Sequence, residues 1–423
     1  VLMVSVSETS GAEQVLTADG ASLKQRLKKT MYRRKILASS LVLPLGIFIF
    51  VTFLFPILLM LFRSVDNPIV YEGLPRVIGA LEKWDGKDLP PEDAYAAMVV
   101  DLANARETKK IGRIASRLNF ETSGVRSLFT STARKAKKLS PPFKEALIKL
   151  NPKWGGREIW ATVKLIGKPF TTVQYLAAVD MRYDVDGNIV MKSEERQIYL
   201  YIFGRTLWIS LLVTALALLL GYPVAYLLAT LPLKYSNILM IAVLLPFWTS
   251  LLVRTTSWIV LLQTNGVIND LLVWSGIISE STRIQMIYNQ TGTIIAMTHI
   301  LLPFMVLPLY SVMKTIPPSY TRAALSLGAN KFTAFVRVYA PQTVPGIGAG
   351  SILVFILSVG YYITPALVGG RTGQLISNFI AFHMQKSLNW GLAAGLGVIL
   401  LIGVLILYWA YSKIVGVDNM KLG

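Results

Sequence analysis

Residues 320–347, YTRAALSLGANKFTAFVRVYAPQTVPGI, have the types and spacing of a docking segment rather than of a catalytic site. Ala323 and Ala324 are adjacent, and Gly328 follows four residues after the second alanine. Small residues let a short helix lie close against another surface. Because the segment is polar and basic between two long apolar stretches, we expect a docking helix near 319–331. An ordinary helix lying on a membrane surface is the alternative interpretation.

Catalytic and metal-binding patterns do not occur elsewhere in the sequence. The chain has no cysteine, and its two histidines, His299 and His383, are far apart. The phosphate-cradling GxxxxGKS/T pattern, the GxSxG elbow and the HExxH pair are absent. An EF-hand interpretation of DVDGN at 184–188 fails, since Arg182 and Ser193 occupy positions that need Asp and Glu. We therefore expect no catalytic residue, no bound metal and no cofactor in this chain.

The composition predicts a polytopic membrane protein. Hydrophobic residues make up 53% of the 423 residues and charged residues only 15%. A helix needs about 20 apolar residues to cross ~30 Å of hydrocarbon. The third candidate span contains Pro246 and Arg254, so we expect it to break near the proline, or its outer half to be re-entrant or interfacial. The six segments of suitable length lie at about 36–62, 203–230, 237–262, 291–313, 346–366 and 389–413.

We attribute the net charge of +19 to basic residues that cluster beside the membrane spans rather than to a nucleic-acid-binding surface. No basic stripe is interleaved with stacking aromatic residues, so we expect no nucleic-acid partner. Seven Lys and Arg residues between 24 and 35 precede the first span, which predicts a cytoplasmic tail over 1–35. Basic residues in the later short loops place the tail 416–423 on the same side. We therefore expect both termini in the cytoplasm.

The segment 63–200 has the composition of a soluble domain. It holds 23 basic and 17 acidic residues, although the whole chain has only 23 acidic residues. An apolar-periodic run from Ala94 to Leu118 predicts one helix, and a second is expected after Pro142. Asp-Gly at 186–187 predicts a β-hairpin turn. We interpret the segment as an external domain that is either a platform for a partner protein or a spacer.

The expected spans lack the groups that power transport. They contain no Asp or Glu, and only His299 offers a proton relay of the kind that proton-coupled carriers need. Since the chain also lacks an ATPase motif, it needs an energised partner or is a passive channel. A membrane-anchored enzyme with its chemistry in 63–200 is disfavoured, because that segment has no nucleophile–base pair or metal-spaced cluster.

The loop residues resemble those of the transmembrane subunits of type I, binding-protein-dependent ABC importers. The loop pattern of that family is EAA, then Gly, then Ile-x-Leu-Pro. Here three residues separate Ala324 from Gly328, and nine separate Gly328 from Val338, as in the family. The resemblance implies that the loop forms a coupling helix that inserts into an ATPase subunit. The departures are Arg322 for Glu, Val338 for Ile and Ala340 for Leu.

Three further stretches are similar to the spermidine/putrescine branch of this family. They are LLGYPVAYLLA at 219–229, LLPFWTSLLVRTTSWIVLLQTNGVIN at 244–269 and GYYITPALVGGRTGQLISNFI at 360–380. The resemblance implies an all-α polytopic membrane protein with six transmembrane helices. It also implies a first helix at 36–62 and a permease core at 201–415. The segment 63–200 lies outside the resemblance, because the family usually has a much shorter first external loop, and we expect it to be a large periplasmic insert.

The function implied by the resemblance is that of a non-catalytic permease subunit in the bacterial inner membrane. It would import a small organic solute, polyamine-like first. Another solute, such as an opine, an amino-acid derivative or a sugar, is the alternative, and a passive channel is a further one. The implied partners are a second homologous permease subunit in a heterodimer, two ATPase subunits that bind ATP and Mg, a periplasmic solute-binding protein and membrane lipid.

Two groups of candidate site residues follow. The aromatic members of the second group are either weak cation–π contacts for a cationic solute or an interfacial belt. Gly360 and Pro365 form either a gate hinge or a plain helix end, and Arg254 is expected to face a cavity or partner, or to be structural in the heterodimer. The coupling group is Arg322, Ala323, Ala324, Gly328, Val338 and Pro341. The pathway or gate group is Trp248, Arg254, Trp258, Gly360, Tyr361, Tyr362 and Pro365.

Overall fold

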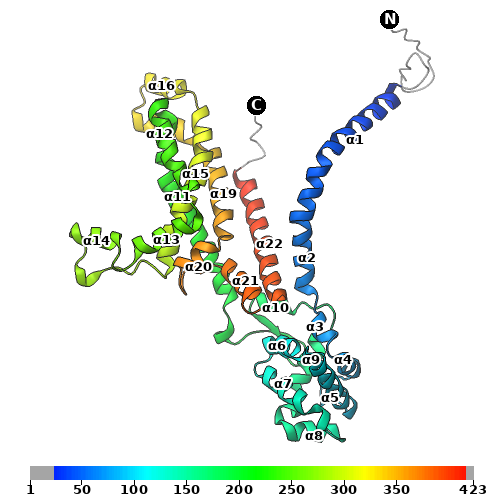
Figure 1. The fold of residues 1–423 in the computed structure, drawn as a ribbon. Helices are drawn as coiled ribbons and strands as arrows, with labels where there is room; N and C mark the ends of the chain where they lie inside the picture. The colour runs from blue at the N-terminus through cyan, green and yellow to red at the C-terminus, as the bar shows by residue number, and fades with distance from the viewer. Residues whose placement is uncertain (1–22, 416–423) are drawn as a thin grey trace. The chain divides into compact units, whose positions relative to one another are not determined.

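The computed structural model describes residues 23–415, and these are almost entirely helical (Figure 1). The expected cytoplasmic tails, up to residue 22 and over 416–423, lie outside the described residues. The chain divides into two compact units, 1–62 and 63–423, which are taken separately below.

The described part of the first unit is one long helix, which is basic over residues 24–35 and apolar after them. It comprises α1 (Leu23–Ile49), a π-helical turn η1 (Phe50–Leu54) and most of α2 (Phe55–Val65). Residues Arg34–Val65 are long and apolar enough to cross a membrane. The sequence-predicted span 36–62 lies within this helix. A helix that is hydrophobic on all faces belongs in a membrane or a large core.

The helical core of the second unit is built on three helices that pack side by side. They are α11 (Tyr199–Thr230), α15 (Gln290–Thr315) and α19 (Val344–Val359), and their shared apolar core includes Val213, Met305 and Val354. Gly350 permits the close crossing of α19 and α15, because a Cβ there would lie 2.7 Å from Met305 Sδ. The last helix, α22 (Trp390–Val415), is a further candidate span.

Two further candidate spans are bent, so the described chain has four straight spans and up to six in all. The first bent pair runs from α12 (Leu233–Leu244) through η5 (Leu245–Trp248), α13 (Leu251–Leu262) and α14 (Val267–Trp274), with a bend of 98°. The expected break at Pro246 is confirmed, since this residue lies in η5. The second pair bends by 58° before α19.

The fifth expected span, 346–366, is wrong at its outer end. Helix α19 stops at Val359, and Gly360 is its C-cap. A separate short helix, α20 (Ile363–Val368), follows. The remaining short elements of the core are η6 (Glu280–Thr282), α16 (Pro318–Ser326), α17 (Lys331–Ala334), η7 (Phe335–Tyr339), α18 (Ala340–Gln342) and α21 (Ile376–Gln385).

Helices α3 to α9 between residues 68 and 166 enclose an apolar core of their own. Its largest fully buried side chains include Tyr95, Phe129, Trp154 and Trp160. Trp154 and Trp160 pack with ring centroids 5.4 Å apart, and the indole N–H of Trp160 donates to the carbonyl of Trp154 at 3.0 Å. The elements are α3 (Pro68–Tyr71), α4 (Pro75–Glu82), α5 (Glu92–Glu107), α6 (Ile111–Glu121), α7 (Val125–Lys135), η2 (Ala136–Lys138), α8 (Phe143–Leu150), η3 (Pro152–Gly155) and α9 (Arg157–Ile166).

The predicted helix from Ala94 to Leu118 is two helices, α5 and α6. The chain breaks at Lys109, whose φ of 57° is left-handed, although the apolar period continues across the break. The helix expected after Pro142 is confirmed as α8. The predicted hairpin is also confirmed, because β1 (Met181–Tyr183) pairs antiparallel with β2 (Ile189–Met191).

The two ends of this helical group meet. Asn67 donates its backbone N–H to the carbonyl of Pro169 at 2.9 Å, and Thr171 donates to the carbonyl of Val65 at 2.9 Å. Asp66 and Phe170 form an isolated antiparallel bridge between these bonds. Residues 68–168 therefore form a closed module whose entry and exit are adjacent, and we call it the insert module.

The chain after the module packs on the helical core. Helix α10 (Val173–Ala178) lies on α22, where Gly391 and Gly395 leave room for it: a Cβ at Gly391 would lie 2.8 Å from Gln174 Nε2. The hairpin β1–β2 and η4 (Glu194–Arg196) then lead into α11. Tyr199 Oη lies 2.8 Å from His383 Nε2, and burial lowers the pKa of His383 to about 4, so its ring is neutral near pH 7. This joint ties α10, α11 and α21 together.

Candidate coupling segment and gate

Three of the six coupling candidates lie in helix α16, and a fourth lies just past its end. Pro318 stands in its first turn, where the missing N–H costs nothing. Gly328 lies just past its end with φ of 91°. Gly328 N–H donates to the carbonyl of Leu325 at 3.0 Å and Ala329 N–H to that of Ala324 at 3.1 Å, which is a Schellman termination.

The sequence suggests that position 328 is a glycine to allow close packing, but the structure gives a different reason. A Cβ at this glycine would meet nothing within 4 Å, so close packing inside the chain does not require it. Its left-handed backbone does, because residues with a Cβ adopt that conformation at a cost. Gly328 therefore sets where α16 stops and in which direction the chain leaves.

Helix α16 has no buried residue. Arg322 and Ala323 are exposed, and Ala324 is half-buried. The apolar side chains next to them are exposed as well: Leu327 is 89% exposed and Phe332 in α17 is 76% exposed. Large apolar side chains gathered on a short exposed segment are typical of an interaction site.

The two remaining coupling candidates, Val338 and Pro341, lie in the bent segment that joins α16 to α19. Val338 is half-buried in the π-helical turn η7, and Pro341 is exposed in α18. The structure thus places all six candidates on one continuous stretch of chain. Pro341 stands one turn before α19, where the helix direction changes by 58°.

An aromatic cluster that sequence reasoning missed anchors this stretch to α11. The ring centroids of Tyr226 lie 5.5 Å from Phe335 and 5.3 Å from Tyr339, and Phe335 stacks on Tyr339 at 5.7 Å. Tyr222 Oη also lies 3.2 Å from Thr343 Oγ1. The available signal was the repeated four-residue spacing, Tyr222 to Tyr226 and Phe335 to Tyr339, which aligns each pair on one helix face. The loop segment is therefore joined to α11 by packed rings.

The gate candidates on α13 meet α15 and α20. Trp258 Nε1 donates to His299 Nδ1 at 3.2 Å, and the two ring centroids are 5.3 Å apart. Thr255 Oγ1 lies 3.3 Å from Thr364 Oγ1 of α20. Arg254 is half-buried beside them, and its Nε is buried without a hydrogen-bond partner in the described chain. A buried charged donor without an acceptor in a largely apolar stretch is costly.

The break between α19 and α20 is held by α21. Asn378 Nδ2 donates to the carbonyl of Tyr362 at 2.9 Å, and Ser377 Oγ donates to the carbonyl of Tyr361. These bonds satisfy backbone groups that a broken helix leaves open within a membrane. Sequence reasoning missed Ser377 and Asn378, since nothing in the local pattern indicates a partner sixteen residues earlier.

The other gate candidates lie around this break or away from it. Gly360 caps α19, and Pro365 is buried in α20. Trp248 lies in η5 and is 75% exposed, and within the described residues no hydrogen bond or ring contact joins it to the α13–α15–α20 group.

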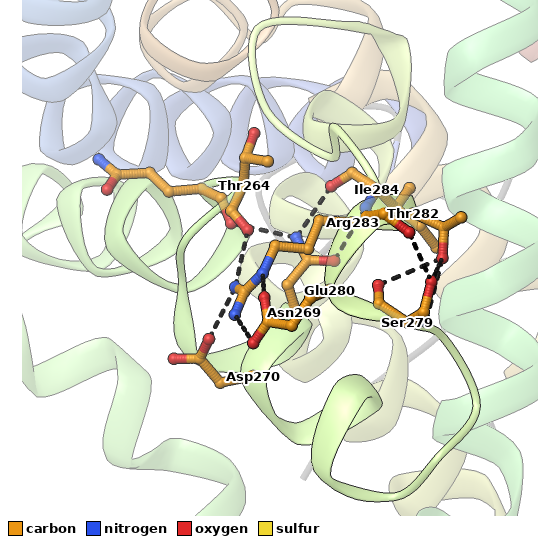
Figure 2. A network of polar contacts seen from close by, with 10 residues as sticks. Thr264, Asn269, Asp270, Ser279, Glu280, Thr282, Arg283 and Ile284 are labelled. Atoms are coloured by element: carbon orange, nitrogen blue, oxygen red, sulfur yellow. Dashed lines mark hydrogen bonds and ion pairs between the residues drawn. The ribbon is translucent and has the colours of Figure 1, made fainter.

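A polar network outside the candidate residues joins parts of the segment between α13 and α15 (Figure 2). The Arg283 guanidinium pairs with Asp270 and Glu280, each at 2.7 Å, and donates to the carbonyl of Thr264 at 3.1 Å. The bond from Arg283 lowers the pKa of Glu280. Asn269 exchanges bonds of 2.9 and 3.0 Å with the backbone of Ile284. The network holds these parts together.

Among residues 23–415, no three His, Asp or Glu side chains gather as metal ligands would. The candidate site therefore consists of the exposed segment α16, a ring-packed link to α11 and the broken-helix region between α19 and α20.

Comparison with known proteins gives the class. Residues 206–415 match the family described as binding-protein-dependent transport system inner membrane component. The chain belongs to this family, and it is a multi-pass permease subunit of a binding-protein-dependent importer. The predicted family and the predicted all-α polytopic fold are confirmed.

Two curated relatives narrow the resemblance. The chain is 34% identical over 253 residues to the spermidine/putrescine transport system permease protein PotB of Escherichia coli K12, covering 59% of this chain and 90% of the relative. It is 36% identical over 220 residues to PotB of Haemophilus influenzae, covering 50% and 76%. A solved bacterial ABC transporter involved in alginate import aligns with a TM-score of 0.42 and 21% identity, covering 54% of this chain and 82% of that one.

Proposed function

We propose that this permease moves a polyamine-like cation across the bacterial inner membrane, driven by separate ATPase subunits. The observation that carries the proposal is the similarity to two PotB proteins, which are named for spermidine and putrescine transport. Selection would rest with a periplasmic solute-binding protein, since the carboxylate in the described candidate spans, Asp270 of α14, is already paired with Arg283.

The partner arrangement follows from the exposed segment α16. Two ATPase subunits would bind ATP and Mg, and one would take α16 and Leu327 into a groove. A second, homologous permease subunit would complete a heterodimer. Exposure of apolar side chains at α16 supports this, because a helix with no buried residue gains its stability from a partner.

A second candidate solute is favoured by Arg254. Its buried Nε lacks an acceptor, and a carboxylate-bearing solute, such as an opine or an amino-acid derivative, would supply one. A polyamine would instead be repelled by this guanidinium. The two candidates therefore make opposite predictions for a variant that removes the charge.

The test is uptake by the full complex in proteoliposomes with its binding protein and internal ATP. Spermidine uptake that rises in Arg254→Met supports the polyamine, whereas abolished uptake of a carboxylated solute supports the second candidate. Ser257→Ala, in the same helix, is the control, because its hydroxyl bonds only to the carbonyl of Val253. Concentrative accumulation by this chain without any ATPase would overturn the energised mechanism.

We further propose that the insert faces the periplasm, that both termini are cytoplasmic, and that the insert is a platform for the binding protein. The absence of cysteine makes the orientation directly measurable. A single cysteine at exposed Ser140 should react with an impermeant maleimide in intact spheroplasts, and one at exposed Ser326 should not. The reverse labelling would contradict this orientation.

The platform is tested by removing residues 68–168 and joining Asn67 to Pro169, whose backbones already touch. Affinity for the binding protein should fall, while α16 still retains the ATPases. Unchanged affinity would leave the insert as a spacer.

A further inference from the structure

A cavity of about 650 Å³ lies between α6 of the insert module and the start of α22. All of its lining residues belong to the unit 63–423. The charged groups that line it are Arg63, Arg113, Arg117 and a single acid, Asp66. Three guanidinium groups against one carboxylate make this a cationic cavity that suits an oxyanion.

The guanidinium group of Arg117 lacks one hydrogen-bond acceptor. The residue is only 5% exposed. Its Nη1 donates to Glu121 at 2.7 Å and its Nε to Asn67 Oδ1 at 3.3 Å, which fixes the guanidinium in place. Its Nη2 is buried and has no partner in the described chain. A buried charged donor without an acceptor is costly, so the geometry favours a ligand oxygen at this nitrogen.

The other two arginines line the same cavity and are exposed. Arg113 is exposed, one turn before Arg117 on α6. Arg63 is exposed, and its guanidinium carbon lies 5.5 Å from the ring centroid of Trp390. Arginine binds phosphate through paired N–H groups, so two exposed arginines beside a buried one can together surround a phosphate.

Part of the cavity wall is apolar, and two of its lining residues lie at the ends of candidate membrane spans. Trp390 begins the candidate span Trp390–Lys413, and Arg63 is near the end of the candidate span Arg34–Val65. Leu388 is 66% exposed and Phe120 is 45% exposed at the same cavity. Tryptophan is enriched at the level of lipid headgroups. A soluble anion would leave these apolar side chains bare, whereas a lipid would cover them.

We propose that this cavity binds the phosphate of an anionic phospholipid headgroup. Arg117 receives the phosphate through Nη2, Arg63 and Arg113 close over it, and the glycerol and upper acyl chains lie against Leu388 and Trp390. The bound lipid would link the insert module to the outer end of α22. The inference does not depend on which solute the permease carries.

The test is lipid retention by the full chain in nanodiscs that contain equal amounts of phosphatidylglycerol and phosphatidylcholine, followed by native mass spectrometry. Wild type should retain phosphatidylglycerol, and Arg63→Gln/Arg113→Gln should retain about tenfold less, since it loses two charge-assisted contacts. Arg126→Gln/Arg134→Gln, on exposed positions of α7, removes the same charge elsewhere in the module. Equal loss in this control, or no loss in the first variant, overturns the proposal.

Two further arms separate other sources of the anion. Arg117→Gln should lose phosphatidylglycerol as well, and its thermal unfolding shows whether the module remains folded; retained lipid in a folded variant overturns the proposal. Millimolar inorganic phosphate should not displace the lipid; full displacement assigns the cavity to a soluble oxyanion instead. A third outcome would assign the cavity to protein docking. In that case the double variant lowers the affinity for the solute-binding protein in pure phosphatidylcholine nanodiscs and leaves lipid retention unchanged.

Discussion

The insert module and helix α16 use apolar residues in opposite ways. The module encloses Tyr95, Trp154 and Trp160 completely, with hydrogen bonds from the indole groups to internal acceptors. Helix α16 buries nothing, and Leu327 beside it is 89% exposed. The module thus has an enclosed core of its own, whereas α16 presents apolar surface that the proposed docking on an ATPase subunit would cover.

The insert module and α16 also differ in how their helix ends are stabilised. Inside the module, Asp101 of α5 accepts the backbone N–H groups of Arg76 and Val77 at 2.9 Å each, so one helix caps another. At α16, the end is set by the local left-handed conformation of Gly328 alone. Variants of each region should therefore fail in different measurements.

The largest effect should come from Trp154→Ala. Deleting a fully buried tryptophan leaves a cavity and costs about 3–5 kcal/mol. Limited proteolysis of the full chain should then cut between residues 68 and 168, while ATPase binding is retained. Trp274→Ala is the control, because that side chain is 85% exposed. Wild-type protease resistance in Trp154→Ala would show that the module does not depend on this core.

Replacing Gly328 by a bulky residue should separate ATP hydrolysis from uptake. Gly328→Val forces a β-branched residue into a left-handed conformation, at a cost of about 1–3 kcal/mol, and redirects the end of α16. Uptake should fall while ATPase activity and membrane insertion persist. Gly328→Asn is the matched control, since asparagine tolerates this conformation. Wild-type uptake by the valine variant would count against coupling through this loop.

A smaller effect is expected from Leu327→Ser. If a partner groove covers this side chain, the variant should weaken ATPase association by about 1–2 kcal/mol without changing thermal unfolding. Leu233→Ser at the start of α12, where the leucine is 67% exposed, should leave association unchanged. Equal weakening by both variants would indicate a general loss of surface hydrophobicity. Copurification from detergent measures the difference.

The smallest effect should be a change in pH dependence. Burial raises the pKa of Asp101 above its usual value, so the folded module binds this proton more tightly than the unfolded chain does. This contribution to stability is present below the usual carboxyl pKa and is lost as pH rises through the raised pKa. Asp101→Asn keeps an acceptor, costs below about 1 kcal/mol, and should flatten the melting temperature across that interval. Glu107→Gln is the control, because Lys137 lowers the pKa of that exposed carboxyl; an equally flat profile there would refute the role of Asp101.

The sequence predicted the features that depend on local pattern. The apolar lengths indicated the spans, Pro246 indicated a break, and the Ala-Ala and Gly spacing indicated the loop helix. The break at Lys109 could not be predicted, because the apolar period runs through it and only packing in the module selects the left-handed residue. The bonds from Ser377 and Asn378 to the α19–α20 break, and the seat of Gln174 against Gly391, also join segments that no local pattern connects.

The backbone bonds from Asn67 to Pro169 and from Thr171 to Val65 have a consequence for the history of this permease. Because the module enters and leaves the chain at one point, a single gene insertion could have added it to an ancestor with a short external loop. The same point offers a natural attachment for foreign cargo. An unrelated domain with neighbouring termini, such as a fluorescent reporter, could be grafted there and report on the transporter in living cells.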